Sequence, residues 1–236
     1  MNLLKIIVSK LKIKTTLEKK FRRKFRDRYS SFLNRKDAPW FNMAAVQFLD
    51  TLDLSKYRVL EFGSGSSTLY FASKCLSVDS YELNPSYFKY TDSQLKFKKI
   101  KNVNLSLYSS DGGDPVGGLY NPTHKLVVLD DTNRGKALQA ILKSSTLPKI
   151  IIFDNSDWMP NHLSLIFREY FIINFNDFPR AAHTHSNFRL NNFATQTSVC
   201  FKKTESLPPQ ILSEITTLQI AAGKLQSKKS KLLDTL

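Results

Sequence analysis

A glycine turn flanked by two acids is the part of this sequence best suited to hold a ligand. The stretch 59–62, which contains Glu61, runs into Gly63-Ser64-Gly65, and a helical pattern begins at Ser66-Ser67. Glycine lets the backbone approach a ligand without a Cβ in the way. A second acid, Glu82, ends the next predicted strand 19 residues after Gly63, and an ionised carboxylate can accept both hydroxyls of a ribose. The spacing therefore predicts a pocket for a ribose-containing ligand.

Two later strand candidates also end in acids. Asp130 follows the apolar stretch 125–129, and Asp154-Asn155 follows 150–153. In a parallel sheet these ends lie at the same edge as the glycine turn. Carboxylate and amide oxygens are the ligands that Mg²⁺ prefers, so Asp130, Asp154 and Asn155 are candidate metal ligands. An acidic cap between a strand and a helix would explain Asp154-Asn155 equally well, and the sequence leaves both interpretations open.

A polar stretch at 180–197 contains His183 and His185. A polar segment of this length in a compact domain is often functional. A histidine near neutral pH could take a proton from an acceptor hydroxyl. The alternative is that both are solvated loop histidines.

The elements that must position these residues alternate between strands and helices. This alternation predicts an α/β fold, a doubly wound and mostly parallel sheet with helices on both faces. The predicted strands are 57–62, 77–82, 103–108, 125–129, 150–153, 171–175 and 198–201, and the predicted helices are 43–52, 67–74, 86–98, 134–144, 163–170 and 210–222.

The order of strand, acid, Gly-x-Gly, helix, strand and acid resembles the class I S-adenosylmethionine-dependent methyltransferases. The resemblance implies a Rossmann-like sheet over about residues 40–203, with Glu82 on the cofactor ribose and Asp111 on the adenine amino group. Ser66 stands where dinucleotide-binding folds often have a third glycine, which disfavours a dinucleotide-dependent oxidoreductase. The cofactor-binding residues implied are Glu61, Gly63, Ser64, Gly65, Ser66, Ser67, Glu82 and Asp111.

A second, partial resemblance is to the cation-dependent O-methyltransferases. In that family an Asp after the fourth strand and an Asp-Asn after the fifth bind a divalent ion that orients the acceptor hydroxyl. The resemblance implies Mg²⁺ at Asp130, Asp154 and Asn155, but Asn133 stands where the family has a Lys. The catalytic candidates are therefore Asp130 and Asp154, with His183 or His185 as a reserve base.

Charge is concentrated at the two ends of the chain. The 236 residues carry a net charge of +15, of which residues 1–36 contribute +11 and residues 221–236 contribute +3. Residues 1–36 have the pattern of a basic amphipathic helix, which could lie on an anionic membrane surface, contact nucleic acid, or pack on the domain. The sequence divides into this arm, a methyltransferase domain at 37–207 and a C-terminal helix with a basic tail at 208–236.

The nearly neutral body disfavours a polyanionic acceptor docking on it. The leading hypothesis is O-methylation of a small-molecule or glycan acceptor, which could be linked to a lipid. The alternatives are a nucleic-acid methyltransferase and a non-catalytic module that binds the cofactor. Two cysteines and the lack of an apolar run of about 20 residues predict a cytoplasmic protein, peripheral to the membrane if the arm binds there.

Overall fold

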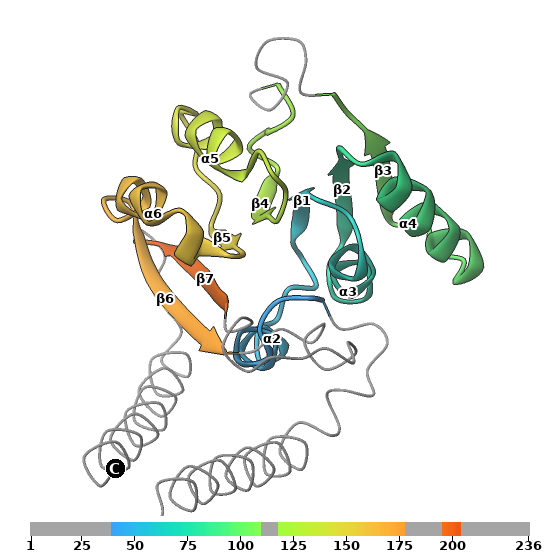
Figure 1. Ribbon diagram of the computed structural model, residues 1–236, viewed down its shortest axis with the longest axis horizontal. Helices are drawn as coiled ribbons and strands as arrows, with labels where there is room; N and C mark the ends of the chain where they lie inside the picture. Colours follow the sequence, from blue (N-terminus) through green and yellow to red (C-terminus); the bar gives the residue numbers. More distant parts are fainter. Residues whose placement is uncertain (1–38, 110–117, 178–194, 204–236) are drawn as a thin grey trace, which may run out of the picture.

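The computed structural model describes residues 39–109, 118–177 and 195–203 (Figure 1). The basic arm at 1–36 and the predicted helix and tail at 208–236 lie outside the described residues. Asp111, His183 and His185 do so as well, and their roles stay predictions.

The centre of the fold is a seven-stranded sheet in the order β3-β2-β1-β4-β5-β7-β6. The strands β1 to β5 are parallel, while β7 pairs antiparallel with both β5 and β6. The strands are β1 (Arg58–Phe62), β2 (Ser77–Glu82), β3 (Val103–Leu107), β4 (His124–Leu129), β5 (Ile150–Phe153), β6 (Tyr170–Asp177) and β7 (Thr195–Lys202). The strand order therefore reverses between β1 and β4, which is where ligands bind in doubly wound sheets.

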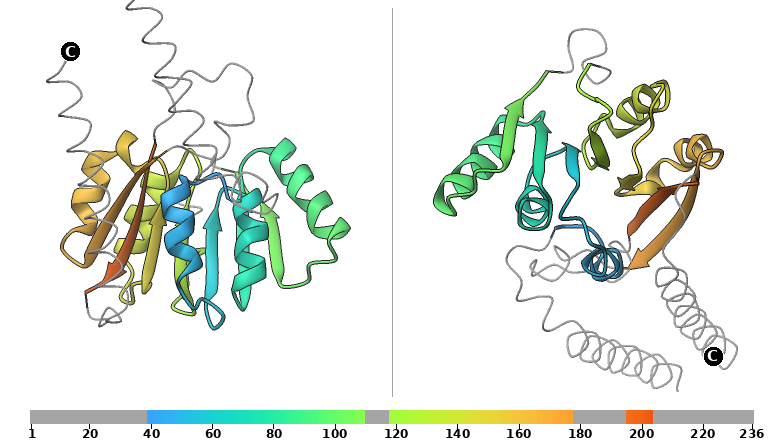
Figure 2. Two further views of the ribbon diagram at one scale, coloured as in Figure 1. Left: turned by 90° about the horizontal axis from the view of Figure 1, so that it is seen from below. Right: turned by 180° about the vertical axis from the view of Figure 1, so that it is seen from behind.

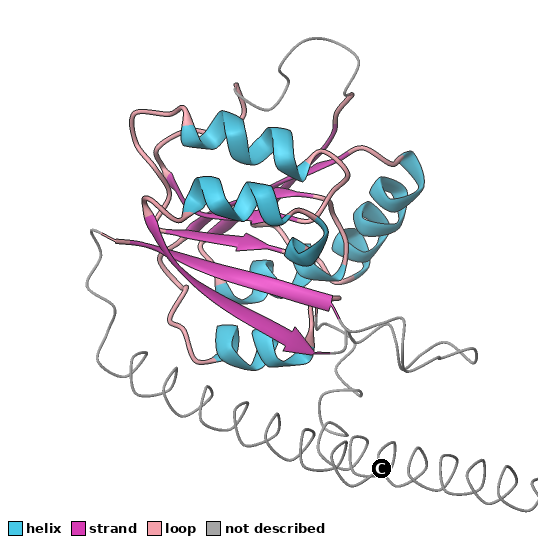
Figure 3. Ribbon diagram, turned by 60° about the vertical axis from the view of Figure 1, so that its left-hand side comes forward, coloured by secondary structure: helices cyan, strands magenta, loops and turns pink. Residues whose placement is uncertain are grey.

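Helices form a layer on each side of this sheet, as Figures 2 and 3 show. The helices α2 and α3 cover one face, α5 and α6 cover the other, and α4 lies beside β3 and α3. The helices are α2 (Met43–Asp50), α3 (Ser66–Lys74), α4 (Pro85–Phe97), α5 (Arg134–Leu142) and α6 (Pro160–Ile166), with a short 3₁₀ helix η1 (Ser156–Trp158). The predicted fold class is confirmed: the sheet is Rossmann-like and mostly parallel.

Alternation along the strands divides the core into two clusters. In β1, Val59 packs with the side chains of α2 and α3, while Leu60 and Phe62 pack with those of α5 and α6. Successive side chains of a strand point to opposite faces, so Glu61 lies on the same face as Val59. That face is covered by α3, and this position decides the role of Glu61.

One predicted helix is displaced, while the other predicted helices among the described residues differ from the observed bounds by at most two residues at either end. The sequence predicted a helix at 163–170, but α6 spans Pro160–Ile166 and Tyr170 already begins β6. The early start follows from Pro160, because proline has a suitable backbone angle for a first helical turn and lacks only an N–H that would be unpaired there. Among the described residues, no helix has both the length and the apolar character needed to cross a membrane.

Candidate functional site

The glycine turn after β1 contacts the end of β4. Gly63 has a φ of +92°, and a Cβ at this position would lie 2.4 Å from the carbonyl oxygen of Asp130. Its N–H donates to the carbonyl oxygen of Tyr81 at 2.8 Å. Both the backbone angle and the close approach require glycine. The turn therefore lies directly against Asp130, at the point where the strand order reverses.

Glu82 holds the turn from behind. Its Oε2 accepts hydrogen bonds from the backbone N–H of Ser64 at 2.6 Å and from the Ser64 hydroxyl at 3.0 Å. Its Oε1 accepts from the backbone N–H of Asn84 at 2.8 Å. Glu82 is buried, and three of its roughly four lone-pair sites are used. The predicted contact with a ribose stays a prediction, and the structure adds a second role in which Glu82 fixes the turn.

Glu61 lies beneath the turn, fully buried. Its Oε2 accepts from the hydroxyls of Thr68 at 2.5 Å and Ser80 at 2.6 Å, and Thr68 Oγ1 in turn accepts from the backbone N–H of Gly65 at 3.0 Å. Burial raises the pKa of Glu61 to about 7, although these hydroxyls lower it. Glu61 lies on the face of β1 that α3 covers, and through these hydroxyls it supports the turn. Its Oε1 has no hydrogen-bond partner among the described residues, and its contact with the cofactor stays a prediction.

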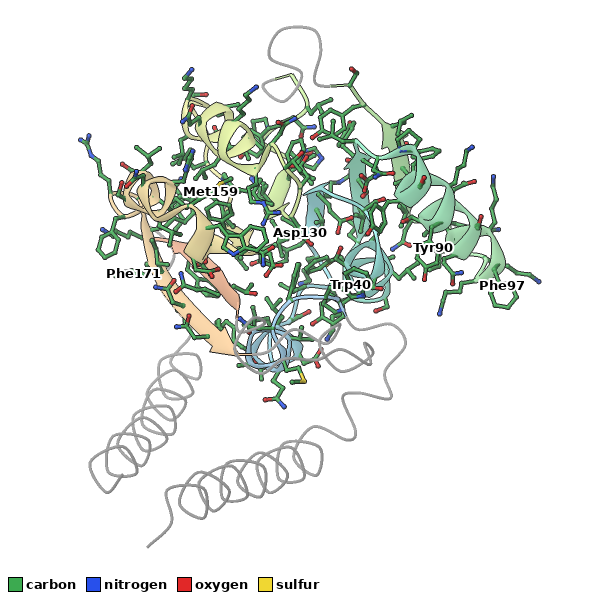
Figure 4. All side chains as sticks on the ribbon, viewed as in Figure 1. Trp40, Tyr90, Phe97, Asp130, Met159 and Phe171 are labelled. Carbon is green, nitrogen blue, oxygen red and sulfur yellow. The ribbon has the colours of Figure 1, made fainter. Side chains whose placement is uncertain are left out.

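A cavity of about 850 Å³ opens on the other side of the turn. It is lined by Ser64–Ser67 of the turn, by Asp130, and by aromatic side chains from α4 and the chain before α2. In Figure 4, Trp40 and Asp130 lie toward the centre of the molecule, while Tyr90 and Phe97 lie along α4. Nothing lies within 4 Å of the position that a Cβ of Gly65 would take. The size and the mixed lining are typical of small-molecule sites.

Asp130 brings a carboxylate into this cavity. Its side chain is 25% exposed, and its nearest charged partner is Arg134 Nη2, 3.9 Å from Asp130 Oδ1. Burial and then the neighbouring charge of Asp154 hold the pKa of Asp130 well above its ordinary value. A carboxylate with a raised pKa is a better proton acceptor, so the predicted catalytic position of Asp130 fits its surroundings.

The other predicted metal ligands are engaged by protein groups. Arg134 Nη1 donates to the backbone carbonyl of Asp154 at 2.6 Å and to Asn155 Oδ1 at 3.0 Å. Thr197 donates its hydroxyl to Asp154 Oδ1. Burial raises the pKa of Asp154 to about 6. No group of three or more His, Cys, Asp or Glu side chains within residues 39–109, 118–177 and 195–203 could hold a metal ion. The donors as arranged do not fit a divalent cation.

Arg134 is the functional candidate that sequence reasoning missed. The comparison of motifs looked for a basic residue at Asn133, one position earlier. Because Arg134 begins α5 four residues after Asp130, the spacing of helical ion pairs could have identified it. The ring centroid of Trp158 lies 5.9 Å from the Arg134 guanidinium carbon.

The surroundings of the turn fit S-adenosylmethionine. The cavity has suitable volume, the space beside Gly65 is open, and Asp130 places a carboxylate on the cavity wall, where it suits a positively charged ligand. Ser64, Gly65, Ser66 and Ser67, which line the cavity, are the predicted residues in position for direct contact. Gly63 acts through the close approach of the turn to Asp130.

No protein-family model matches this chain, and no curated protein matches it. Several solved structures are similar to this chain over about two thirds of its length, each with a TM-score below 0.5. An rRNA methylase from Streptococcus thermophilus is 14% identical, with a TM-score of 0.48, over 66% of this chain and 92% of that chain. A precorrin-6y C5,15-methyltransferase from Geobacter metallireducens is 15% identical, with a TM-score of 0.48, over 67% and 87%.

A third similar structure is a candidate methyltransferase from Streptococcus mutans in complex with SAH. It is 11% identical, with a TM-score of 0.47, over 66% of this chain and 94% of that chain. The names of all three are those of methyltransferases, the family that the sequence resembles. A likeness at this level carries no argument about function, so the function has to be argued from the site itself.

Proposed function

We propose that this protein is an S-adenosylmethionine-dependent methyltransferase that acts on a hydroxyl acceptor. The observation that carries the proposal is that a single cavity is lined by both the Ser64–Ser67 turn and the carboxylate of Asp130. The turn offers open backbone for the cofactor, and Asp130 offers a proton acceptor beside it. The proximity of the two is fixed, because Gly63 lies against the backbone of Asp130.

When bound, S-adenosylmethionine supplies a methyl group on a positively charged sulfur. The turn would hold it through the backbone at Ser64 and Gly65, while Glu61 and Glu82 keep the turn in place from behind. Asp130 would accept the proton of the acceptor hydroxyl. The aromatic side chains on the cavity wall would exclude water and orient the acceptor, which is the larger part of what such a reaction needs.

The acceptor we propose is a small molecule or a glycan, including one linked to a lipid. Support comes from the charge distribution, since residues 37–220 carry a net charge of only +1. An attachment of residues 1–36 to an anionic membrane from the cytoplasmic side remains part of this proposal. Mg²⁺ is left out of it, because Arg134 and Thr197 already engage the predicted ligands.

Calorimetric titration of S-adenosylmethionine into the full chain tests the cofactor site. We expect micromolar binding by the wild type and at least about tenfold weaker binding by Gly65→Ala, a change of about 1.4 kcal/mol. The reason is that the added methyl group fills cavity space without touching the protein. Gly118→Ala is the matched control, because Gly118 also has open space but lies outside the cavity lining. Equal binding by all three would reject this site, and no binding by the wild type would reject the cofactor.

Asp130→Asn tests the transfer step separately. We expect cofactor binding to persist, while formation of S-adenosylhomocysteine with responsive acceptors falls by about 10²–10⁴-fold. The acceptor panel would include catechols, sugars and lipid-linked glycans, with RNA as the arm for the alternative. In the wild type the rate should rise with pH through the raised pKa of Asp130, since only the ionised carboxylate accepts a proton. Unchanged transfer by the variant would remove Asp130 from the mechanism.

A further inference from the structure

The acidic edge formed by Asp130, Asp154 and Asn155 contains its own cation. We infer that the guanidinium of Arg134 stands where a divalent metal would bind these three residues, so that this edge works without a metal ion. Arg134 is then a positioning residue that acts through Asp130. The inference deepens the proposed function and rests on it only for the role of Asp130, because the binding of metal can be measured without any cofactor.

The contacts of Arg134 reach each part of the edge. Nη1 donates to the carbonyl oxygen of Asp154 and to Asn155 Oδ1, and Nε donates to the carbonyl oxygen of Asp131 at 2.5 Å. Nη2 lies 3.9 Å from the carboxylate of Asp130. One planar group therefore connects the end of β4 with the end of β5. A metal ion would have to collect its ligands from these same two strand ends.

The guanidinium is held in place on several sides. The side chain of Arg134 is only 10% exposed. The ring of Trp158 lies over it at 5.9 Å, which is within the range of cation–π contact. The next residue, Gly135, packs closely against His162, because a Cβ there would lie 2.6 Å from His162 Nε2. Arginine remains protonated throughout the accessible pH range, so the positive charge at the edge is permanent.

The oxygens left over do not make a second cation site. Asp154 Oδ1 accepts from Thr197, and Asp131 accepts from the Tyr108 hydroxyl and from the backbone N–H of Asn133. Mg²⁺ requires near-octahedral oxygen coordination, and a divalent ion placed here would also meet the positive guanidinium. The consequence for the reaction is that Asp130 keeps a free carboxylate facing the cavity, stabilised at a distance by Arg134.

Binding of Mn²⁺ to the full chain, followed by electron paramagnetic resonance, tests the inference. We expect the wild type and Arg134→Lys to bind no Mn²⁺ that depends on Asp154. Arg134→Met should gain a saturable Mn²⁺ site, and that site should disappear in Arg134→Met/Asp154→Asn. Lys136→Met is the matched control, because it removes one positive charge from the exposed side of the same helix and should gain no site.

Two outcomes would overturn the inference. The first is saturable Mn²⁺ binding by the wild type that Asp154→Asn abolishes, which would place a metal and Arg134 together at the edge. The second is an Arg134→Met variant that melts cooperatively but gains no Mn²⁺ site, which would show that the edge is not a metal-type donor set. If Arg134→Met does not fold, the comparison of the wild type with Asp154→Asn still decides. Neither outcome bears on whether the wild type binds S-adenosylmethionine.

Discussion

Two groups of acids meet at the same edge of the sheet, and the protein accommodates them in different ways. Glu61, at the end of β1, is surrounded by neutral hydroxyls from Thr68 and Ser80. Asp130 and Asp154, at the ends of β4 and β5, share the guanidinium of Arg134. Burial raises the pKa in both groups, to about 7 for Glu61 and to about 6 for Asp154.

The two groups differ in role: Glu61 supports the turn, while Asp130 is the candidate proton acceptor. Hydroxyls can solvate either a charged or a protonated carboxyl group, so Glu61 can hold the turn in either state. A guanidinium favours the ionised state, which is the state in which Asp130 could accept a proton. The group with hydroxyls lies beneath the turn, while the group with the cation includes the carboxylate that lines the cavity.

The largest expected effect on stability comes from a change at Gly63, where the glycine turn contacts the backbone of Asp130. Gly63→Ala would place a methyl group 2.4 Å from the Asp130 carbonyl oxygen and would hold a non-glycine residue at a φ of +92°. We expect a loss of more than about 4 kcal/mol in the free energy of unfolding, in the range reserved for severe backbone conflicts. Urea unfolding measures it, with Gly118→Ala as the control. A loss below about 1 kcal/mol would mean that the turn moves freely against β4.

Removing the cation should affect only the second group. Arg134→Met removes the positive charge beside Asp130 and Asp154 and leaves the backbone carbonyl of Asp154 without its donor, and the loss of such a buried charge typically costs about 3–5 kcal/mol. Because Arg134 lowers the pKa of Asp154, that pKa should rise further in the variant. The loss should therefore be full at pH 8 and much smaller at pH 5, where Asp154, with its pKa of about 6, is already mostly protonated. Unfolding at the two pH values checks this, and a loss independent of pH would point to packing instead of charge.

Glu61→Gln should increase the free energy of unfolding at high pH, whereas the two variants above decrease it. With a pKa raised from 4.5 to about 7, folded wild-type protein holds a proton that the unfolded chain has released, and its stability falls as the pH rises through that window. Gln removes this dependence and should stabilise the protein at pH 8 by up to about 3 kcal/mol. At pH 4 the two proteins should be nearly equal. Destabilisation at both pH values would mean that the charge of Glu61 is required.

The smallest expected losses of stability come from removing one hydroxyl from each group. Thr68→Val and Thr197→Val each remove a fully buried hydroxyl that donates to a carboxylate. We expect a loss of about 2 kcal/mol for Thr68→Val and about 1 kcal/mol for Thr197→Val. The reason is that Arg134 still stabilises the Asp154 carboxylate in Thr197→Val, whereas no cation among the described residues stabilises Glu61 in Thr68→Val. Thermal unfolding of the pair measures the difference, and the reverse order would contradict the comparison.

The regular part of the fold followed from the sequence alone. The bounds of β2 and β5 were predicted to the residue, because alternation in one and a continuous apolar run in the other are local signals. The turn at Gly63 was likewise visible, since its glycine spacing reflects a backbone requirement. The helix α6 was misplaced because the apolar residues at 163–170 continue into β6, and periodicity cannot separate a short helix from the strand that follows it.

The roles of individual acids were harder to predict. The resemblance implied a cofactor contact for Glu61, and it did not indicate the supporting role that follows from the position of Glu61 on the face that α3 covers. The role of Arg134 depends on how α5 begins relative to β5, a distance of some 20 residues along the chain that only the folded sheet closes. Residue types predicted which groups would meet at the edge, while their protonation and pairing depended on burial.

The contact between Gly63 and Asp130 gives the site a proton linkage. A cationic ligand seated on the turn would lie near carboxyl groups whose pKa values burial raises, that of Glu61 to about 7. Its positive charge would lower their pKa values and release protons on binding, and by reciprocity a higher pH would tighten the binding. The heat of binding would then vary with the ionisation enthalpy of the buffer. The number of protons released on binding would therefore indicate whether the ligand on the turn is positively charged.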